Sequence, residues 1–561
     1  MFDYIIVGGG SAGCVLASRL TEDANVTVCL LEAGPRDSHP LIHMPMGILW
    51  MMYSKVLNWQ FHTRSEPELG GRKLFWPRGR TLGGCSSSNA MCYMRGHPHD
   101  YDEWAALGNA GWAFSDVLPY FKRSENQERG ESAWHGVGGP LNVADIRTPN
   151  LLSKVFIQAG VEAGLPFNDD FNGPQQEGVG LFQVTQKGGR RCSTARGYLA
   201  PALQRPNLTV ITDAHAMRVL FKGNTASAVE YRHGGMIKQA RAAREILLCA
   251  GAVQSPQLLM LSGIGDAAEL QAAGIPVQAH LPGVGKNLQD HLDVILVQAC
   301  KKHVSGGLTV RNFLRSGWEI MRYLASGSGM YTSNAAEGCA FARSGPDETI
   351  PDLQFHFTSS RLSNHGRNFR FLLGEGYSLH VCNLRPKSRG EIRLASRDPM
   401  AKPDIFANYL SHPDDMEHMV RGVKMARRIL AAPAFDPYRG AWLMPQAANG
   451  TANESDEDIR SFIRERAETI YHPVGTCKMG KDPMAVVDDQ LRVHGLQGLR
   501  VVDASIMPFL IGGNTNAPTV MIAEKASDMI KHSHGAKNSS SATPTAEAAA
   551  PGVSTDTVPA A

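Results

Sequence analysis

The residues best suited to chemistry lie in two short motifs near the C-terminus. His472 occurs in YHPVGTC (471–477), and Asn514 and Asn516 occur in GGNTNAP (512–518), which opens the last expected helix. An imidazole can take up or release a proton near neutral pH. A single histidine is more often a buried structural residue than a catalyst, so this motif alone leaves both interpretations open. Asn516 is expected to cap the helix, whose N-terminus could stabilise negative charge on a ligand.

A glycine-rich turn at the start of the chain predicts a dinucleotide site. The sequence GGGSAG (8–13) has the form GxGxxG, follows an apolar strand and precedes a segment with helical spacing. Its glycines permit a tight turn close to a pyrophosphate, and the helix N-terminus offers free N–H groups. Glu32, at the end of the next strand, can accept hydrogen bonds from a ribose. The candidate contacts are Gly8, Gly10, Ser11, Ala12, Gly13, Glu32 and Ala33.

A second cluster, PRGRTLGGCSSSN (77–89), is too long for a simple hairpin. A second loop rich in backbone groups suits a flavin better than a nicotinamide cofactor, because the isoalloxazine ring also has to be held. A flexible surface loop is the weaker alternative, since apolar residues resume at 90–94. A third motif, GAVQSP (251–256) running on to SGIG (262–265), could be purely structural. The candidate contacts in the second cluster and just after it are Arg80, Gly83, Gly84, Ser88, Asn89 and Met91.

The elements that must position these motifs are those of an α/β protein. Apolar strands at 3–7 and 26–31 flank a helix at 11–20, which is a βαβ unit and the start of a doubly wound parallel sheet. Segments 208–212, 218–221 and 226–231 alternate like antiparallel strands. Further strands are expected at 245–250, 379–384 and 391–394, and helices at 416–430, at 456–468 behind a Ser455 cap, and at about 517–531. Residues 534–561 are rich in Ser, Thr, Ala and Pro and predict a disordered tail.

The composition excludes several classes of protein. A formal net charge of +3 over 561 residues gives no broad basic face for nucleic acid. The ten cysteines contain no CxxC pair, so no zinc or thioredoxin-like motif is expected, and reduced thiols in a cytoplasmic protein are favoured. No signal peptide is apparent, and no stretch reaches the roughly 18 apolar residues of a membrane span. The sequence therefore predicts a soluble protein, or one associated with a membrane only at its surface.

Together these motifs resemble the glucose–methanol–choline (GMC) oxidoreductase family. The resemblance covers about residues 1–531, includes both long glycine signatures (79–89 and 251–265), and extends to the C-terminal His472 and Asn514. Within the family the chain is most similar to the membrane-associated medium-chain alcohol dehydrogenases of alkane-degrading bacteria. The stretches that suggest this are LLEAGPRDSHPLIHMPMGI, GVGLFQVTQKGGRR and RAETIYHPVGTCKMGKDP. Choline and polyethylene glycol dehydrogenases are close alternatives.

The resemblance implies a fold and a domain organisation. The family fold is a Rossmann-type FAD-binding domain with an inserted substrate domain built on an antiparallel sheet. The FAD-binding domain would comprise residues 1–155, 192–300 and 470–532, and the substrate domain residues 156–191 and 301–469. Residues 533–561 would form the tail.

The resemblance also assigns roles to single residues. His472 would be the catalytic base and Asn514 its partner beside the flavin N5. Asn516 would face the flavin C2 carbonyl, and Ala216 the adenine. Some relatives attach FAD covalently through a histidine in the 83–89 loop, but this chain has a serine there, so FAD is expected to bind non-covalently. The remaining candidate contacts are Asp503 and Ala504 near the diphosphate, and Ala517 after Asn516.

The implied reaction is oxidation of a primary alcohol, with hydride transfer to flavin N5 and electrons passed to a quinone. Choline or polyethylene glycol oxidation and an oxidase reaction with O2 are alternatives within the class. A flavin-binding protein without turnover and a lyase are alternatives from other classes. Choline would need an aromatic cage for its ammonium group. Glu337 could supply charge, but it follows Ala335 and Ala336, which disfavours choline.

A quinone is soluble in lipid, so two segments are considered for contact with a bilayer. Residues 41–53 are unusually apolar for a segment punctuated like a loop, and residues 311–324 predict a helix that carries both aromatic and basic side chains. The alternatives are that the first lines the substrate entrance and that the second packs on the core. The expected location is the cytoplasm or the inner face of the bacterial cytoplasmic membrane, and the oligomeric state stays open.

Overall fold

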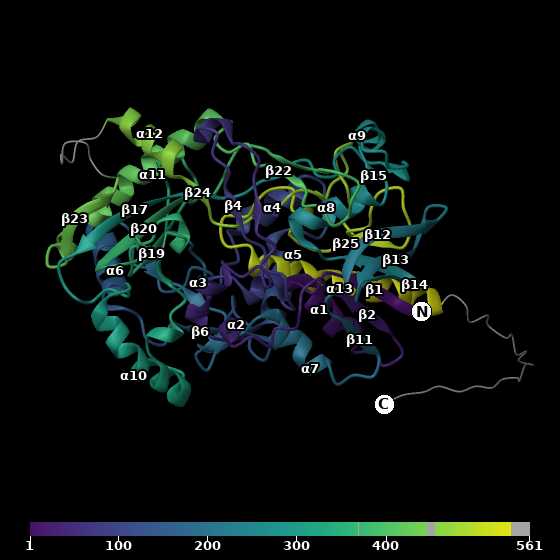
Figure 1. Ribbon diagram of the computed structural model, residues 1–561, viewed down its shortest axis with the longest axis horizontal. Coiled ribbons are helices and arrows are strands. Elements are labelled where there is room, and N and C mark those ends of the chain that lie inside the picture. Colours follow the sequence, from purple (N-terminus) through teal and green to yellow (C-terminus); the bar gives the residue numbers. More distant parts are fainter. Residues whose placement is uncertain (369, 446–454, 540–561) are drawn as a thin grey trace, which may run out of the picture.

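The computed structural model of the chain describes residues 1–368, 370–445 and 455–539. Two seven-stranded sheets form its centre, one at the right of Figure 1 and one at the left. The predicted α/β class, with a Rossmann-type unit and a second antiparallel sheet, is confirmed. No described helix is long and apolar enough to cross a bilayer.

The first sheet contains the N-terminal βαβ unit. Its strands β1 and β2 are apolar because helices and loops cover both faces, so both periodic positions are buried. Strands β11, β2, β1 and the second half of β14 pair in parallel. Strands β12, β13 and the first half of β14 form an antiparallel extension. In spatial order the strands are β11 (Leu208–Ile211), β2 (Val28–Leu31), β1 (Phe2–Val7), β14 (Met236–Leu248), β13 (Thr225–His233) and β12 (His215–Lys222), with β25 (Leu499–Val501) also pairing with β14.

One strand orientation was predicted wrongly. Residues 208–212 were expected to be antiparallel, but β11 pairs with β2 in parallel at the edge of the sheet. An edge strand is only partly covered, so its alternation of side chains resembles that of a half-exposed antiparallel strand. The pattern therefore indicated a strand correctly but could not give its direction.

The second sheet is antiparallel throughout and lies against α6 and α11 (Figure 1). Its strand β17 is buried along nearly its full length, between neighbours that come from later parts of the chain. The strands are, in spatial order, β23 (Arg439–Met444), β17 (Leu292–Cys300), β20 (Gly376–Asn383), β19 (Leu353–Thr358), β18 (Ala336–Ala342) and β7 (Gly178–Leu181), with β24 (Glu468–Thr469) also pairing with β17.

The helices follow the predicted periodicity closely. Ser455 caps α12 and accepts a hydrogen bond from the backbone N–H of Asp458, as expected. Asn516 is not the cap that was predicted: α13 begins at Asn516, which leaves Thr515 at the cap position. The longer helices are α1 (Ser11–Leu20), α4 (Pro98–Ala106), α5 (Phe114–Ser124), α6 (Leu151–Glu162), α8 (Gly251–Leu261), α10 (Val310–Ser326), α11 (Pro413–Ala431), α12 (Asp456–Arg466) and α13 (Asn516–Ser539).

Smaller elements complete the chain between these helices and strands. Two of them, α2 (Pro40–His43) and α3 (Ile48–Met51), lie in the apolar segment 41–53. The others are α7 (Ala200–Ala202), α9 (Ala267–Ala272), β3 (Phe61–His62), β4 (Phe75–Trp76), β5 (Glu125–Gln127), β6 (Leu141–Asp145), β8 (Gln183–Val184), β9 (Gln186–Lys187), β10 (Arg190–Arg191), β15 (Ile264–Gly265), β16 (Ala279–His280), β21 (Glu391–Arg393) and β22 (Asp404–Phe406).

The positions of strands and helices in the two sheets can be compared with the predicted domain boundaries. Strand β17 ends at Cys300 and belongs to the second sheet, although residues up to 300 were assigned to the FAD-binding domain. Helix α6 begins at Leu151, just before the expected boundary at 155, and α6 packs beside that same sheet. We propose that the chain passes from the first unit to the second near residue 291, because β17 begins at Leu292.

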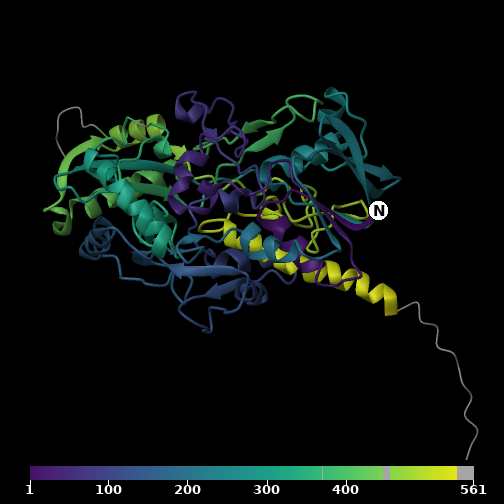
Figure 2. The same ribbon diagram turned by 60° about the horizontal axis from the view of Figure 1, so that its bottom comes forward.

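Helix α13 ties the last part of the chain to the first. Figure 2 shows it as a long yellow helix on the underside of the first unit. Its buried Glu524 accepts hydrogen bonds from Arg19 on α1, Arg123 on α5 and Tyr198. A carboxylate this deep is costly to bury unless cations and donors surround it, and here three side chains do so.

The predicted start of the tail is wrong. The helix continues to Ser539, and Nε2 of His534 donates to the buried Glu245 carboxylate at 2.8 Å. Burial opposes ionisation of Glu245, but its hydrogen bonds with His534 and Arg500 lower its pKa to about 2. Residues 540–561, the rest of the expected tail, lie outside the described residues.

Two truncations test where the folded chain ends. A chain ending at Ser539 should keep the melting temperature of the full chain, because residues 540–561 contain almost no large apolar side chain. A chain ending at Ser533 should lose about 1 kcal/mol of stability, since Glu245 loses the hydrogen bond from His534. Thermal melting and denaturant unfolding measure the two effects. Equal stability of the two truncated chains would contradict a structural role for His534.

Candidate active site

One large cavity runs along the carboxyl edge of the first sheet. Val7 at the end of β1, Leu31 at the end of β2, Cys249 just after β14 and Asp503 shortly after β25 all line it. In doubly wound sheets ligands bind at this edge, because loops rather than side-chain layers fill it. The cavity continues between the two sheets to His472 and Asn514.

The first glycine turn presents the N-terminus of α1 to this cavity. Gly8 has a φ of 103°, a conformation that favours glycine, and Gly10 precedes the helix with no side-chain cap. A Cβ added to Gly10 would meet no atom closer than 3.8 Å, so the space in front of the helix is open. Gly13 has a different role, since a Cβ there would lie 1.9 Å from the Gly8 carbonyl oxygen. Gly10 thus leaves room for an anion, while Gly13 allows α1 to pack on β1.

Glu32 lies at the expected place beside this turn. Its two carboxylate oxygens accept hydrogen bonds from the backbone N–H groups of Gly9, at 2.8 Å, and Gly34, at 2.7 Å. Burial raises its pKa to about 7 despite these bonds. Ala33 and Ala216 line the same end of the cavity. Arg80 does not line it, but stacks on Trp59 at 4.9 Å and leaves its buried Nε without a hydrogen bond in the described part of the chain.

The second glycine loop interlocks with the first. Gly83 donates its N–H to the Gly9 carbonyl at 2.7 Å, and a Cβ on Gly84 would lie 2.8 Å from the Gly10 Cα. Buried Arg191 donates to the backbone carbonyls of Ser86 and Asn89, which fixes the end of the loop. The sequence gave no indication of this arginine. Of the contacts predicted in and just after this loop, Gly84, Ser88, Asn89 and Met91 line the cavity.

The N-terminus of α13 reaches the same cavity from the opposite end of the sequence. Asn516 accepts a hydrogen bond from the Ser11 hydroxyl at 2.9 Å, which joins the first turns of α1 and α13. Asn516 also lines the cavity, and its amide N–H groups could donate to a ligand there. Ala504 also lines the cavity, whereas Ala517 is buried in α13 and does not.

His472 and Asn514 are in contact, as the sequence predicted. The Asn514 side-chain amide nitrogen lies 3.3 Å from Nε2 of His472, and its oxygen accepts from Gln354 at 3.2 Å. The backbone N–H of His472 donates to Asp290 at 2.7 Å. Asp290 also accepts from the hydroxyls of Tyr409 and Thr469, and burial raises its pKa to about 6. His472 is therefore held both through its backbone N–H and through its ring nitrogen.

A second histidine, which the sequence analysis missed, determines which nitrogen of His472 can act. Nε2 of His291 lies 3.0 Å from the carbonyl oxygen of Leu384, so it must carry a proton to donate. Neutral His291 then has a bare Nδ1, which lies 3.0 Å from Nδ1 of His472 and must accept a proton from it. Nε2 of His472 is consequently unprotonated, and it is the atom that faces Asn514.

Burial favours this neutral state of both rings. Burial lowers the pKa of His291 to about 4, and it lowers the pKa of His472 well below its usual value, with the neighbouring His291 and His356 acting in the same direction. A base with a lowered pKa is unprotonated at neutral pH and can accept a proton. The geometry thus provides a ready proton acceptor at the cavity wall.

The loop that carries Asn514 is fixed at Gly512. The Gly512 N–H donates to buried Asp100 at 2.8 Å, and its carbonyl accepts from Gln176 at 2.8 Å. Gly513 packs against Gly96, whose backbone nitrogen would lie 3.5 Å from an added Cβ. The backbone N–H and carbonyl of Gly512 are thereby both held, two positions before Asn514.

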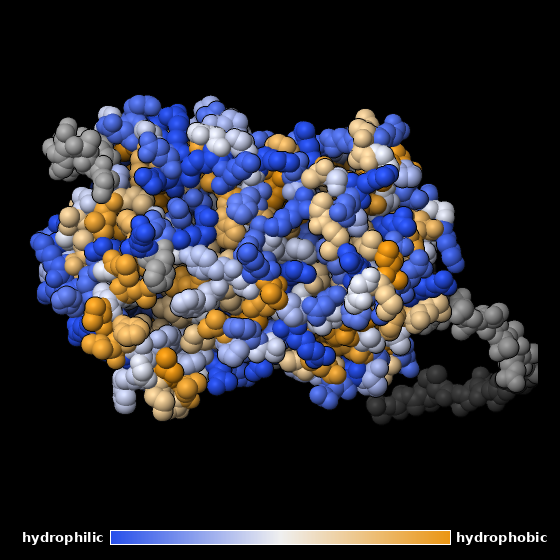
Figure 3. All heavy atoms as spheres, viewed as in Figure 1, coloured by the Kyte–Doolittle hydropathy of each residue, from blue (hydrophilic) through white to orange (hydrophobic). Residues whose placement is uncertain are grey.

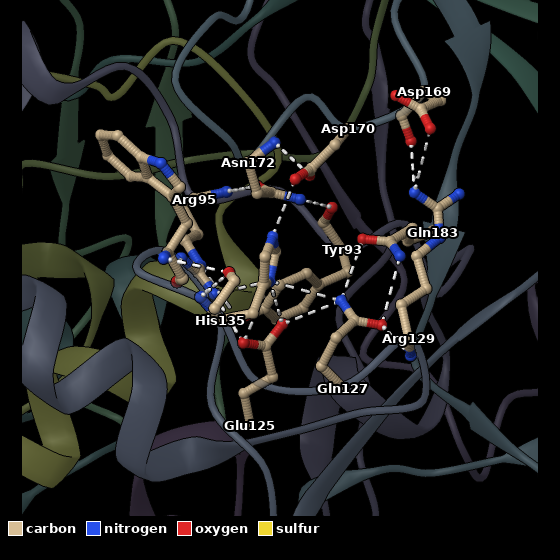
Figure 4. Close-up of polar contacts among 12 residues, drawn as sticks. Tyr93, Arg95, Glu125, Gln127, Arg129, His135, Asp169, Asp170, Asn172 and Gln183 are labelled. Atoms are coloured by element: carbon tan, nitrogen blue, oxygen red, sulfur yellow. Dashed lines mark hydrogen bonds and ion pairs between the residues drawn. The ribbon is translucent and has the colours of Figure 1, made fainter.

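A buried ionic cluster supports the chain just before Gly96 (Figure 4). Arg95 pairs with Glu125 at 2.7 Å, and His135 lies 3.0 Å from Glu125 and 2.9 Å from Asp170. Burial works against charge on His135, but its bonds to Asp170 and Glu125 raise its pKa to about 8. Each buried charge has a partner, so the cluster can hold residues 93–96 rigidly without an uncompensated ion.

The remaining wall of the cavity comes from segment 41–53, for which lining of an entrance was one of the two interpretations, and from strands that no sequence motif indicated. Apolar side chains from residues 48–52 form part of it, and the strands of the second sheet add His356, Thr358 and His380. His380 lies 2.6 Å from Asp293, which is fully buried. The strand predicted at 379–384 overlaps β20, β19 was not predicted, and the sequence did not indicate which face of either strand turns toward the cavity.

Comparisons with known proteins agree with this architecture. The GMC oxidoreductase family models match residues 2–293 and 386–523. The chain is 51% identical to an alcohol dehydrogenase [acceptor] of Pseudomonas putida, over 94% of this chain and 96% of that protein. It is 46% identical to the mitochondrial choline dehydrogenase of Mus musculus, over 94% and 89%. It is also 46% identical to an oxygen-dependent choline dehydrogenase of Chromohalobacter salexigens, over 94% and 95%.

Solved structures give the same result for the fold. Pyridoxine 4-oxidase from Mesorbium loti superposes with a TM-score of 0.85 at 33% identity, over 95% of this chain and 100% of that one. A formate oxidase gives a TM-score of 0.88 at 27% identity, over 95% and 99%. With both sheets, the glycine turns and the histidine–asparagine pair in place, the chain belongs to the GMC oxidoreductase family.

Proposed function

We propose that the protein is an FAD-dependent alcohol dehydrogenase that oxidises a primary alcohol to its aldehyde. The observation that carries this proposal is the unprotonated Nε2 of His472 beside Asn514, at the end of a cavity that begins at a dinucleotide-type glycine turn. The 51% identical relative is named an alcohol dehydrogenase [acceptor], which supports the same reaction class. An oxidised flavin supplies the hydride acceptor in this chemistry.

The residues of the cavity fit FAD. The open space before Gly10 and the uncapped N-terminus of α1 suit a diphosphate, and Glu32 lies where a ribose would be held. Asp503 and Ala504 would lie along the diphosphate, Ala216 beside the adenine, and the N-terminus of α13 with Asn516 beside the electron-rich edge of the flavin ring. Gly13, Gly83, Arg80 and Ala517 do not line the cavity, and we assign them supporting roles.

The chain's own residues account for the proton in the reaction. Nε2 of His472 accepts the hydroxyl proton of the alcohol, while the Asn514 amide N–H donates to the alcohol oxygen as negative charge develops on it. Once protonated, the His472 ring keeps its Nδ1 proton directed at His291. The apolar side chains of residues 48–52 exclude water from the reacting carbon and accommodate an alkyl chain.

Choline is the second candidate substrate, because relatives at 46% identity are choline dehydrogenases. The contacts of Glu337 argue against it. This buried carboxylate accepts from Asn150, Ser153 and Ser333 and does not line the cavity. Anaerobic flavin reduction by 1-octanol, choline and a polyethylene glycol separates the candidates, and reoxidation by a quinone or by O2 identifies the acceptor. We propose a quinone; fast reoxidation by O2 alone would contradict that part.

Replacement of the base tests the assignment directly. His472→Ala should retain FAD but slow flavin reduction by roughly 10²-fold or more, and Asn514→Ala should slow it less. Stopped-flow reduction by the preferred alcohol measures both, with His99→Ala, on the exposed side of α4, as the matched control. Because the lowered pKa of His472 keeps it neutral, the wild-type rate should fall only as the pH drops below the usual histidine range. Near-normal reduction by His472→Ala would rule out its role as base.

We propose that FAD is bound without a covalent bond, because Ser88 in the second glycine loop cannot form a histidyl link. FAD modification is described for the formate oxidase of Aspergillus oryzae, a more distant structure at 27% identity. Acid precipitation of the purified protein should therefore release all of the flavin into the supernatant. Mass spectrometry of the precipitate provides the check: a polypeptide with the added mass of a flavin would refute non-covalent binding.

We also propose that α10 docks on a lipid surface, where a quinone would be available. Glu319 of α10 is buried and accepts from the Met330 N–H, so this side of the helix faces inward and much of its apolar side faces outward. Apolar side chains gather over α10 at the lower left of Figure 3. Arg315 and Arg322 approach Glu319 at 3.5 and 4.0 Å, which reduces the charge they offer to lipid. Six side chains of α10 are between 62% and 79% exposed, namely Val310, Phe313, Leu314, Trp318, Met321 and Leu324.

Vesicle flotation tests this docking. The wild type should float with vesicles that contain anionic lipid, and Phe313→Ser/Trp318→Ser should reduce binding roughly tenfold or more because apolar burial is lost. Arg315→Glu/Arg322→Glu should mainly change the dependence on salt. Phe167→Ser, an equally exposed aromatic residue elsewhere, is the control. Flotation of the Phe313→Ser/Trp318→Ser protein at the wild-type level would exclude α10 as the docking surface.

A further inference from the structure

A cluster of potential metal ligands lies at the second sheet, away from the cavity. His418 is on α11, Asp352 directly precedes β19, and Glu348 lies in the loop before it. One ligand atom from each residue can be chosen so that all three lie within 4.8 Å of one another. None of the three lines the cavity, so the proposed alcohol oxidation does not use them.

Two buried polar atoms in this cluster have no hydrogen bond. Asp352 is 0% exposed, and its Oδ1 accepts from the Ser344 N–H at 2.6 Å. Its other oxygen, Oδ2, and Nδ1 of His418 make no hydrogen bond within the described residues. They lie 3.8 Å apart, which is too far for a hydrogen bond to join them. Burying a carboxylate oxygen and an imidazole nitrogen without hydrogen bonds costs free energy, so we expect a bound group between them.

We propose that Glu348, Asp352 and His418 bind one divalent transition metal ion, with Zn²⁺ as the best match. Two carboxylates and one imidazole form a common ligand set for Zn²⁺, with water in the open position. Ligands at about 2.0–2.1 Å from a tetrahedral ion lie roughly 3.3 Å apart. An ion can bind only one nitrogen of His418, and the unpaired Nδ1 faces Asp352. Glu348 Oε1 lies 3.5 Å from the other nitrogen, Nε2, so the Glu348 side chain, which is 29% exposed, would have to turn toward Nδ1.

The site would join three separate parts of the second unit. The loop between β18 and β19 carries Glu348, and the carbonyl of Asp352 accepts from the Leu384 N–H at 2.8 Å. A bound ion would therefore fix this loop to α11 and brace the end of β20. One nearby cation opposes binding: Nη2 of Arg421 lies 3.6 Å from Glu348 and would have to share or release that carboxylate. Removal of this arginine should consequently tighten metal binding.

Calorimetry and thermal melting of the FAD-loaded, tag-free protein test the site. After treatment with a chelator, the wild type should bind one equivalent of Zn²⁺ and gain about 2 °C or more in melting temperature. Glu348→Gln, at the partly exposed ligand, should weaken binding at least tenfold, His418→Ala should abolish it, and Arg421→Gln should strengthen it. His303→Ala removes a histidine that pairs with a carboxylate elsewhere on the surface and should change nothing.

The competing explanation is a protonated His418 that pairs with the two carboxylates and needs no metal. In that case the wild type would bind no Zn²⁺, or would bind it no better than Glu348→Gln, and either result overturns the proposal. Because Glu348 is partly exposed, its variant should fold even if His418→Ala does not. The variants leave the cavity intact, so failure of metal binding would leave the proposed alcohol oxidation untouched.

Discussion

The interaction on which the active site depends is a chain of hydrogen bonds with only one consistent direction. The Leu384 carbonyl can only accept, so it requires a proton on Nε2 of His291, which requires one on Nδ1 of His472. Nε2 of His472 is then available for a substrate hydroxyl. The backbone carbonyl just after β20 thus sets the protonation state of a residue 88 positions later in the sequence.

This chain requires both structural units at once. Leu384 follows β20 and His291 precedes β17, so the second sheet supplies the acceptor and the intermediate ring. Asn514 precedes α13, which packs with α1 on the first unit through Glu524 and Arg19. Displacement of either unit by an ångström would break the contacts at 3.0 and 3.3 Å. Rigidity at the junction is therefore a condition of the proposed chemistry.

Buried charges supply much of that rigidity. Asp290 holds the backbone of His472, Asp100 holds Gly512, and the cluster around Arg95 holds the segment against which Gly513 packs. Such groups are costly to desolvate and contribute little net stability. They do fix geometry, because each has several specific partners and tolerates no shift. On α10 the arrangement is partly reversed, because Glu319 is buried while six apolar side chains are exposed.

Local pattern in the sequence was sufficient for part of this structure. The turn before α1, the acidic residue after β2, several of the helices and strands, and the pairing of His472 with Asn514 were predicted, since each rests on neighbouring residues or on a resemblance carried by short motifs. Tertiary structure alone decided the parallel direction of β11, the role of His291, the use of Glu337 away from the cavity, and the outward face of α10. These depend on partners far away in the sequence, and the spacing of residues carries no information about which distant backbone group will meet a given side chain.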